Sequence, residues 1–339
     1  MIPFIPLFGN IAVAEVPLGS RDRFGLKELS LVVASANVFS SPVSKKGSDD
    51  VNQQDNLNLP FGAHTLLEGF KVDYRLLEAL TAPCEKHGVT AFEVLFAGTA
   101  EPDRVEVLSR FKRGLNIPNL SVCVFFAGDM PDPLIPDQAD AALKHIVEAC
   151  EYAKAIGATK VAGPIGHSIG KPGTPDQVTA FLKRAVAATE STGIVLGLEP
   201  LRREECMAYN GFDDAIKIVD AVGSPRLGIH FDTFHNHCFG GTPQVTLRAI
   251  GQRLVHVHVS GSERMTPGTD KVNWQSVADG LREVGYKGSV VLELFGPDCR
   301  KEMPGIVDPN FPSALSVPTS LEVTRWCLER HGIVSPRAA

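Results

Sequence analysis

Four residues whose side chains can bind a metal ion or move a proton stand at nearly regular intervals along the chain. They are Glu199, Asp232, His258 and Glu293, which we call the strand-end quartet. The intervals of 33, 26 and 35 residues each match one strand-and-helix repeat, so the four side chains can converge in a barrel. Three carboxylates and one imidazole form a mostly oxygen ligand set, which suits Mn²⁺, Mg²⁺ or Co²⁺ better than a structural zinc ion.

Each member of the quartet ends a run of apolar residues that is typical of a buried strand. A single carboxylate at such a place can simply accept hydrogen bonds from neighbouring loop amides. Four polar residues at the ends of consecutive strands are a stronger signal. Burying three carboxylates together opposes their ionisation unless a cation balances the charge. The quartet therefore predicts a divalent metal centre.

The elements that would position the quartet alternate in the pattern of a parallel sheet built from strand-and-helix units. Seven strands are predicted at Thr90–Phe96, Leu120–Phe126, Thr159–Pro164, Gly193–Glu199, Arg226–Asp232, Arg253–Val259 and Ser289–Phe295. Helices are predicted at Asp73–Gly88, Asp140–Gly157, Asp176–Gly193, Phe212–Gly223 and Val277–Gly285. An earlier apolar run, Leu29–Phe39, supplies the eighth strand. Eight units predict a (β/α)8 TIM barrel of the α/β class rather than an open doubly wound sheet.

The predicted barrel is a single domain over residues 29–335, preceded by an N-terminal extension over residues 1–28. Two long segments, Ser40–Gly69 and Gly296–Ser316, follow the first and eighth predicted strands and would lie over the catalytic face. They are either lids or partner-binding loops, or mobile insertions, and the sequence leaves both open. The extension is apolar but lacks a basic region, so we interpret it as packing or interface material rather than a signal peptide or membrane anchor.

Composition and charge narrow the class of protein. The 339-residue chain has a formal net charge of −6 and a pI of about 5.9, which argues against a nucleic-acid-binding surface. Its seven cysteines are scattered and contain no C-x-x-C pair, which favours a reduced cytoplasmic setting over a disulfide framework. We expect a small-molecule substrate, no nucleic-acid partner and no membrane association.

Several stretches around the quartet resemble one family of barrel enzymes. They are Leu198–Glu205 (LEPLRREE), Asp232–His235 (DTFH), His258–Trp274 (HVSGSERMTPGTDKVNW) and Val290–Phe295 (VVLELF). In these motifs, and from about Asp140 to the C-terminus, the chain resembles the xylose-isomerase-like sugar isomerases and epimerases. Among them it is similar to the ketose 3-epimerases of the tagatose and allulose type. Residues 1–28 have no counterpart in this resemblance.

The resemblance implies a role for each matching residue. The quartet would bind the metal ion, with Mn²⁺ the first choice, and Glu199 and Glu293 would also exchange protons on opposite faces of a substrate carbon. Glu205, His235 and Arg264 would hold the O1–O2–O3 end of a ketose. The family also implies a homo-oligomer, a dimer or a tetramer. The chemistry is consistent with these residue types, because removing a proton beside a carbonyl leaves charge on an enediolate oxygen that a metal ion stabilises.

Other histidines near the quartet receive different interpretations. By strand alternation, His230 and His256 point the same way as the quartet members two residues later, but one layer deeper. We expect them to be hydrogen-bonded core residues rather than metal ligands. His237 is predicted in a loop. His167 is predicted at the pocket rim, where it is either an additional base or hydroxyl contact, or a solvated loop histidine.

The chain departs from the family pattern at Arg202, where the family usually carries an asparagine, and in the residues after His235. These departures leave a second reaction open. Related barrels act as metal-dependent lyases on 3-oxo-glycosides, as in the catalytic subunits of C-glycoside deglycosidases, which bind a small partner subunit. An apurinic endonuclease, which shares the barrel, would need extra ligand pairs and a basic surface, and we expect neither here. A non-catalytic interaction protein would have lost the quartet.

Overall fold

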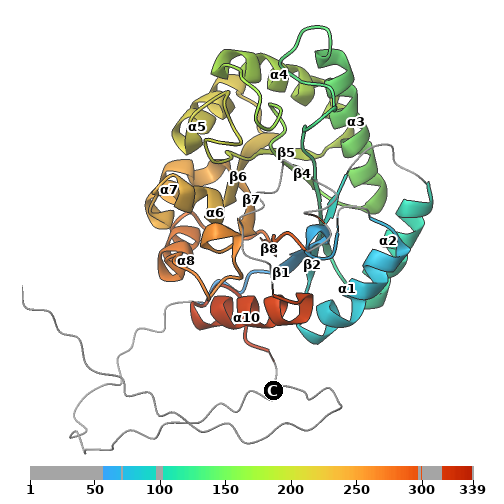
Figure 1. Cartoon of the computed structure of the whole chain (residues 1–339), viewed down its shortest axis with the longest axis vertical. Coiled ribbons are helices and arrows are strands. Elements are labelled where there is room, and N and C mark those ends of the chain that lie inside the picture. The colour runs from blue at the N-terminus through green and yellow to red at the C-terminus, as the bar shows by residue number, and fades with distance from the viewer. Residues whose placement is uncertain (1–55, 70–71, 97–101, 297–298, 300–314, 338–339) are drawn as a thin grey trace, which may run out of the picture. The chain divides into compact units, whose positions relative to one another are not determined.

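The computed structural model describes residues 56–69, 72–96, 102–296, 299 and 315–337. Within this part of the chain, eight parallel strands form one closed barrel in the order β1 to β8 (Figure 1). The strands are β1 (Phe61–His64), β2 (Ala91–Leu95), β3 (Asn119–Cys123), β4 (Lys160–Gly163), β5 (Val195–Leu198), β6 (Leu227–Asp232), β7 (Leu254–Val259) and β8 (Val290–Leu292). The predicted (β/α)8 fold is therefore confirmed.

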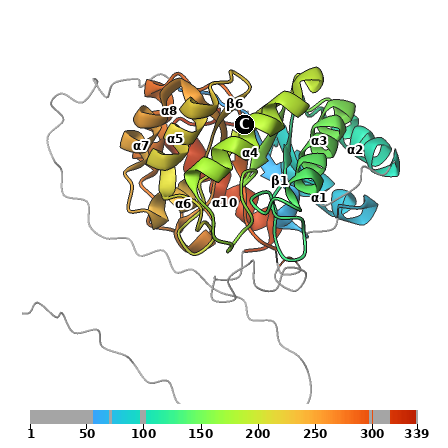
Figure 2. The same ribbon diagram turned by 90° about the horizontal axis from the view of Figure 1, so that it is seen from above.

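Helices surround the barrel and cover the outer face of its sheet (Figures 1 and 2). They are α1 (Tyr74–Lys86), α2 (Pro102–Leu115), α3 (Ala139–Ile156), α4 (Pro175–Ala188), α5 (Gly211–Val222), α7 (Pro243–Ile250), α8 (Trp274–Glu283) and α10 (Val317–Arg330). Shorter pieces connect them: α6 (Thr233–Cys238), η1 (Thr65–Leu67), η2 (Glu190–Thr192), η3 (Gly251–Arg253) and η4 (Ser262–Arg264). The main core lies between strands and helices, as where Phe92 of β2 packs on Phe111 of α2 with ring centroids 4.6 Å apart.

Local sequence signals set the helix ends. α3 ends at Gly157, whose φ of 75° is the left-handed conformation that glycine adopts without strain, and its N–H donates to the carbonyl of Ala153. The predicted helix Asp176–Gly193 is divided into α4 and η2. Thr189 lies between the two pieces. Its hydroxyl donates to the carbonyl of Ala185 and so competes with the regular helical hydrogen bonds.

The first barrel strand differs from the prediction. Leu29–Phe39 lies outside the described residues, and the strand that completes the barrel is β1, inside the segment Ser40–Gly69 that we predicted as a long loop. The prediction was wrong because the sequence of β1, FGAH, is short, contains a glycine and has no β-branched side chain, so it carries no strand signature.

Gly62 explains why this strand tolerates a glycine. It pairs with Ala91 of β2 on one side and with Val291 of β8 on the other. A Cβ atom at position 62 would lie 2.8 Å from Cγ2 of Val291, which is closer than side chains normally approach. The missing side chain therefore lets β1 close the barrel between β2 and β8.

The last helix is tied to the start of the barrel. In α10, Arg325 donates to the carbonyls of His87 and Gly88, which directly follow α1. Just after α10, the carbonyl of Gly332 accepts the backbone N–H of Leu57. The two ends of the described barrel are thus joined by hydrogen bonds as well as by the pairing of β1 with β8.

Two predictions concern residues that lie wholly or mostly outside the described part of the chain. The boundary between residues 28 and 29 lies outside the described residues, as does most of Gly296–Ser316, so the domain limits and the loop after β8 stay predictions. Among the residues that are described, no helix combines the length and apolar character needed to cross a lipid bilayer.

Candidate active site

The barrel brings the strand-end quartet together. One ligand atom from each of the four residues lies within 4.8 Å of the other three, and all four residues are buried. Glu199 directly follows β5, Asp232 is the last residue of β6, His258 lies in β7 and Glu293 directly follows β8. Asp232 and His258 face each other in the β6–β7 register. The predicted convergence at one height is what the structure contains, while the roles assigned to the four residues stay predictions.

Local contacts fix the backbone beneath the quartet. Asp232 is the N-cap residue of α6: one of its carboxylate oxygens accepts the backbone N–H of Phe234 at 2.7 Å. The hydroxyl of Tyr209 donates to the carbonyl of Glu199 at 3.0 Å, and Pro200 keeps the backbone of Glu199 extended. The two carboxylates therefore leave the barrel wall in defined directions.

The side chains of the quartet form a donor set that fits a divalent cation. Oε1 of Glu199 and Nδ1 of His258 are buried and have no hydrogen-bond partner among the described residues. The same Nδ1 lies 3.4 Å from Oε2 of Glu293 and 4.0 Å from Oε1 of Glu199. Unpartnered buried polar atoms are costly, and a cation ligated by oxygen and imidazole nitrogen would satisfy both.

Charge in the quartet is unevenly distributed. Burial, together with the neighbouring carboxylate of Glu293, raises the pKa of Glu199 well above its ordinary value. Burial also opposes ionisation of Glu293, but Arg264 and His258 hold the pKa of Glu293 well below its ordinary value. Burial also raises the pKa of Asp232, so without a further cation the site opposes the simultaneous ionisation of its three carboxyl groups.

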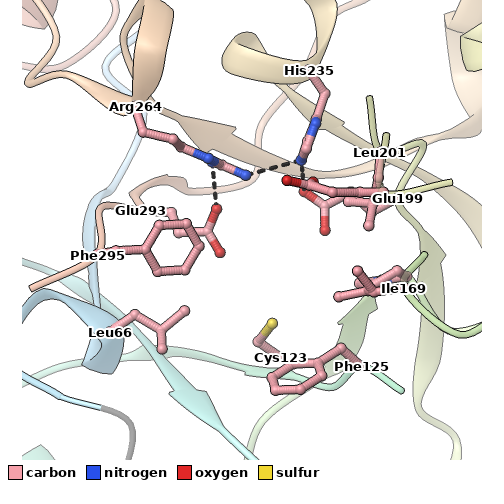
Figure 3. Close-up of a pocket in the computed structure, with 12 residues that line it drawn as sticks. Leu66, Cys123, Phe125, Ile169, Glu199, Leu201, His235, Arg264, Glu293 and Phe295 are labelled. Atoms are coloured by element: carbon pink, nitrogen blue, oxygen red, sulfur yellow. Dashed lines mark hydrogen bonds and ion pairs between the residues drawn. The ribbon is translucent and has the colours of Figure 1, made fainter. Parts of the chain in front are cut away.

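Arg264 is a fixed cation beside the quartet (Figure 3). Its Nη1 donates to Oδ2 of Asp232 at 2.6 Å and to Oε2 of Glu293 at 2.7 Å. Its backbone φ of 55° is in the left-handed region, and the guanidinium lies 4.3 Å from the ring centroid of Phe234. Bridging, stacking and full burial leave the guanidinium little freedom.

His235 and Glu205 complete the polar side of the site. Nδ1 of His235 accepts the backbone N–H of Arg202 at 2.9 Å, and its Nε2 lies 3.8 Å from Oε1 of Glu199. Burial and the nearby Arg264 lower the pKa of His235 well below its ordinary value, so the ring is neutral. Glu205 accepts a hydrogen bond from Nε of Arg202 at 2.8 Å, and burial raises its pKa.

These residues line one side of a small cavity of about 50 Å³ at the mouth of the barrel. The polar lining side chains are Glu199, Glu205, His235, Arg264 and Glu293, and the apolar ones are Leu66, Cys123, Phe125, Pro164, Ile169, Leu201 and Phe295. Figure 3 shows that Leu66, Cys123, Phe125 and Ile169, which we call the apolar wall, face the polar side chains across the cavity.

Two histidines lie where the sequence did not predict them. His167 is fully buried rather than at the pocket rim: its ring packs edge-on against Tyr209 with centroids 5.4 Å apart, and it does not line the cavity. The segment after β4 turns at Gly163, whose φ is 132°, and Ser168, next to His167, forms a bridge with Phe126 after β3. His237 is exposed as predicted for a loop residue, but it belongs to the short helix α6.

A polar layer, of which the sequence analysis predicted only His230 and His256, fills the barrel below the quartet. We call Glu93, His64, Ser121, His230 and His256 the deep cluster, and all five are buried. His230 and His256 are buried as predicted, although His230 has no hydrogen-bond partner among the described residues. The clusters of possible ligands that include Glu93 and His64 contradict our expectation of no extra ligand pairs. The available signal was Glu93 itself, an acidic residue inside the apolar strand TAFEVLF.

Comparisons with known proteins agree with this architecture. Residues 82–324 match the model of the family described as xylose isomerase-like TIM barrel. The chain is 31% identical to a D-psicose 3-epimerase of Enterocloster bolteae over 39% of this chain and 44% of that protein. It is 28% identical to an L-ribulose 3-epimerase of Methylomonas sp. over 55% of this chain and 64% of that protein. The match thus spans less than two thirds of each of these relatives.

A solved structure is similar over a larger share of its length. The crystal structure of D-allulose 3-epimerase from Methylomonas sp. in complex with D-allulose superimposes with a TM-score of 0.71 at 21% identity. The superposition covers 80% of this chain and 96% of that one. At this level of identity the likeness shows the fold.

Proposed function

Because the chain belongs to the xylose isomerase-like TIM barrel family, we propose that it is a metal-dependent sugar isomerase, and specifically a ketose 3-epimerase. The observation that carries the proposal is the quartet: three carboxylates and one imidazole converge at the mouth of the barrel, and two of the carboxylates line a cavity. The relatives named as 3-epimerases support the reaction class.

The quartet would hold the metal ion, for which Mn²⁺ is the first candidate and Mg²⁺ or Co²⁺ the alternatives. When bound, a divalent ion supplies stabilisation of the negative charge that develops on an oxygen beside the carbon losing its proton. Support for the fit comes from the two unpartnered buried atoms, Oε1 of Glu199 and Nδ1 of His258.

Glu199 and Glu293 would exchange the proton. They approach the cavity from different sides in Figure 3, and epimerisation needs one group on each face of the substrate carbon. Their pKa values are shifted in opposite directions, upward for Glu199 and downward for Glu293. A bound divalent cation would favour the ionised form of both carboxyl groups, so that either could accept a proton from its own face of the carbon.

Arg264, His235 and Glu205 would hold the reactive end of the sugar. The guanidinium provides a directed positive charge close to Glu293, and the neutral imidazole and the carboxyl group offer hydrogen bonds to hydroxyl groups. All three line the cavity together with the acid/base pair. The apolar wall would contact the rest of the sugar through its C–H groups.

The alternative reactions, the cellular location and the oligomeric state are supported to different degrees. The lyase reaction on 3-oxo-glycosides finds no support from the relatives compared, and the endonuclease reading is disfavoured because the deep cluster is sealed below the cavity and the chain is acidic. We further propose a cytoplasmic enzyme, in keeping with seven cysteines that form no disulfide. A dimer or tetramer stays a prediction.

The test is proton exchange at the substrate carbon. Protein loaded with Mn²⁺, with its metal content measured, is incubated in D₂O with a panel of free ketohexoses and ketopentoses. We expect one deuterium at C3 together with the epimeric ketose, read by chromatography and mass spectrometry. If metal-loaded protein exchanges no proton with any free ketose, the epimerase proposal is wrong, and 3-oxo-glycosides become the next panel.

A further inference from the structure

The deep cluster contains a carboxylate that touches the quartet from below. We propose that Glu93 is a positioning residue for the metal centre: its carboxylate contacts Nε2 of His258, which leaves Nδ1, on the side of the quartet, as the nitrogen that binds the ion. The inference rests on the proposed function in one respect, namely that the quartet binds a divalent metal ion.

The contact between the two residues is direct. Oε1 of Glu93 lies 2.7 Å from Nε2 of His258, and neither side chain is accessible to solvent. An ionised carboxylate can only accept hydrogen bonds, so the proton must reside on Nε2. In the metal-bound site Nε2 would therefore carry the only proton of the ring, because a cation binds at a nitrogen without a proton, here Nδ1. That atom lies 3.4 Å from the Glu293 carboxylate, on the side of the quartet.

The rest of the deep cluster holds Glu93 in place. Its Oε2 is 2.5 Å from Nε2 of His256 and accepts a hydrogen bond from the hydroxyl of Ser121. Nε2 of His64 lies 3.5 Å from Oε1. Both carboxylate oxygens are thus contacted from strands β1, β3 and β7, and the side chain cannot rotate away from His258 without losing several partners at once.

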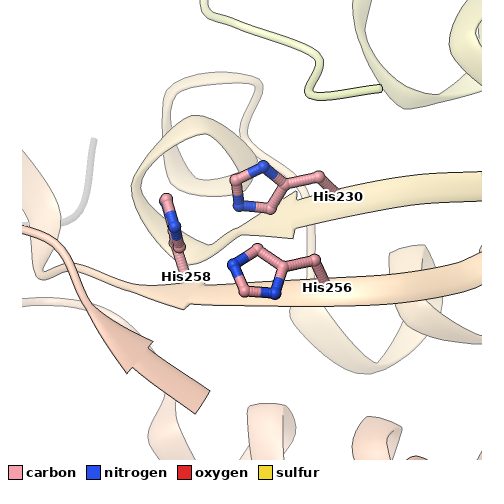
Figure 4. Close-up of side chains that lie close together, drawn as sticks. All are labelled: His230, His256 and His258. Carbon is pink, nitrogen blue, oxygen red and sulfur yellow. The ribbon is translucent and has the colours of Figure 1, made fainter. Parts of the chain in front are cut away.

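The ring of His258 is also fixed by its neighbours. Figure 4 shows His230 and His256 side by side on adjacent strands, with His258 beyond them toward the strand ends. The His258 ring packs edge-on against His230 with centroids 4.1 Å apart, and against His256 with centroids 5.0 Å apart. Packing fixes the ring plane, and Glu93 selects which nitrogen carries the proton. Carboxylate partners of this kind orient metal-binding histidines and raise their affinity for the ion.

The experiment compares Mn²⁺ affinity in three variants by titration calorimetry on EDTA-stripped protein. We expect the dissociation constant to rise by about 10- to 100-fold in Glu93→Gln and further in Glu93→Leu. Ser121→Ala is the matched control: it removes a hydrogen bond to the same carboxylate but leaves the Glu93–His258 contact, and we expect at most about a threefold change. Circular dichroism and thermal unfolding establish that each variant folds.

A second measurement does not depend on the Glu93 and Ser121 variants. In the Mg²⁺-loaded protein labelled with ¹⁵N-histidine, long-range ¹H–¹⁵N spectra report which ring nitrogen carries the proton, and the His258 signal is assigned by its loss in His258→Asn. We expect the Nε2–H tautomer. A proton on Nδ1, or wild-type Mn²⁺ affinity in folded Glu93→Gln and Glu93→Leu, would overturn the proposal. If the wild-type protein itself binds no Mn²⁺, the proposal that the quartet is a metal centre is wrong, and this inference is wrong with it.

Discussion

The two halves of the barrel present different chemistry to the same cavity. Strands β5 to β8 end in the quartet, and the segments after them add Glu205, His235 and Arg264. The segments after β1 and β4 and the end of β3 contribute the apolar wall instead. One half therefore carries groups that can transfer a proton, and the other carries apolar side chains that set the shape of the cavity. We expect substitutions in the first half to lower kcat and those in the second to change KM and the choice of sugar.

The largest effect is expected from the acid/base pair. Glu199→Gln or Glu293→Gln keeps the size of the side chain but removes its ability to exchange a proton, so turnover should fall by at least about 10²- to 10⁴-fold. Deuterium incorporation at C3 measures the loss. Full activity in either variant, with the fold intact, would show that the assigned half of the barrel does not carry the proton transfer.

Arg264 tests whether a directed cation is needed in the same half. Lysine keeps the charge in Arg264→Lys but cannot bridge Asp232 and Glu293 while also reaching His235. We expect kcat/KM to fall by about 10²-fold, as when a positioned donor is removed from a developing anion. Steady-state kinetics on the best ketose provides the value. An unchanged kcat/KM would mean that Arg264 serves only to balance the charge of the carboxylates.

The apolar wall is tested at Phe125. In Phe125→Leu the cavity widens away from the quartet, so we expect KM to rise about tenfold with kcat nearly unchanged, and longer ketoses to gain relative to shorter ones. Phe111→Leu is the matched control, because Phe111 is equally buried, at 8% exposure, but packs outside the barrel against Phe92. A similar KM change in both variants would point to general loosening of the fold.

The smallest effect is expected for His237, which is two residues from His235 but exposed on α6. His237→Ala should leave kcat/KM within about twofold of the wild type, since exposed substitutions away from special features are nearly neutral. His235→Ala is its matched partner and should lose most activity. Equal losses in the two variants would mean that α6 as a whole, rather than one ring, contacts the sugar.

The sequence predicts some parts of the molecule better than others for physical reasons. The convergence of the quartet was predictable because strand-end residues spaced by about one repeat meet at the same face of a barrel. β1 was not, because the closure at Gly62 depends on a close approach to Val291 that only the assembled barrel requires. His167 was placed at the rim because the turn at Gly163 is set by contact with the neighbouring strand, where a Cβ would lie 2.2 Å from the carbonyl oxygen of Val124.

Glu93, His64 and Ser121 of the deep cluster were missed for another reason. Sequence patterns separate apolar from polar faces, and an interior of this fold is usually filled by branched aliphatic side chains. Glu93 breaks that rule, and its meaning depends on His256 and His258, which lie more than 160 residues further along the chain. Only the closed barrel brings β2 and β7 to the same interior layer.

The pairing of β1 with β8 bears on how the protein is made. Phe61 pairs with Val290, so β1 leaves the ribosome 229 residues before its second neighbour exists. At ordinary elongation rates that delay is on the order of tens of seconds. During this time one edge of the growing sheet is open to pairing with other chains. Translation speed and early chaperone contact should therefore govern the yield of folded protein, and slowing synthesis after β7 should favour aggregation.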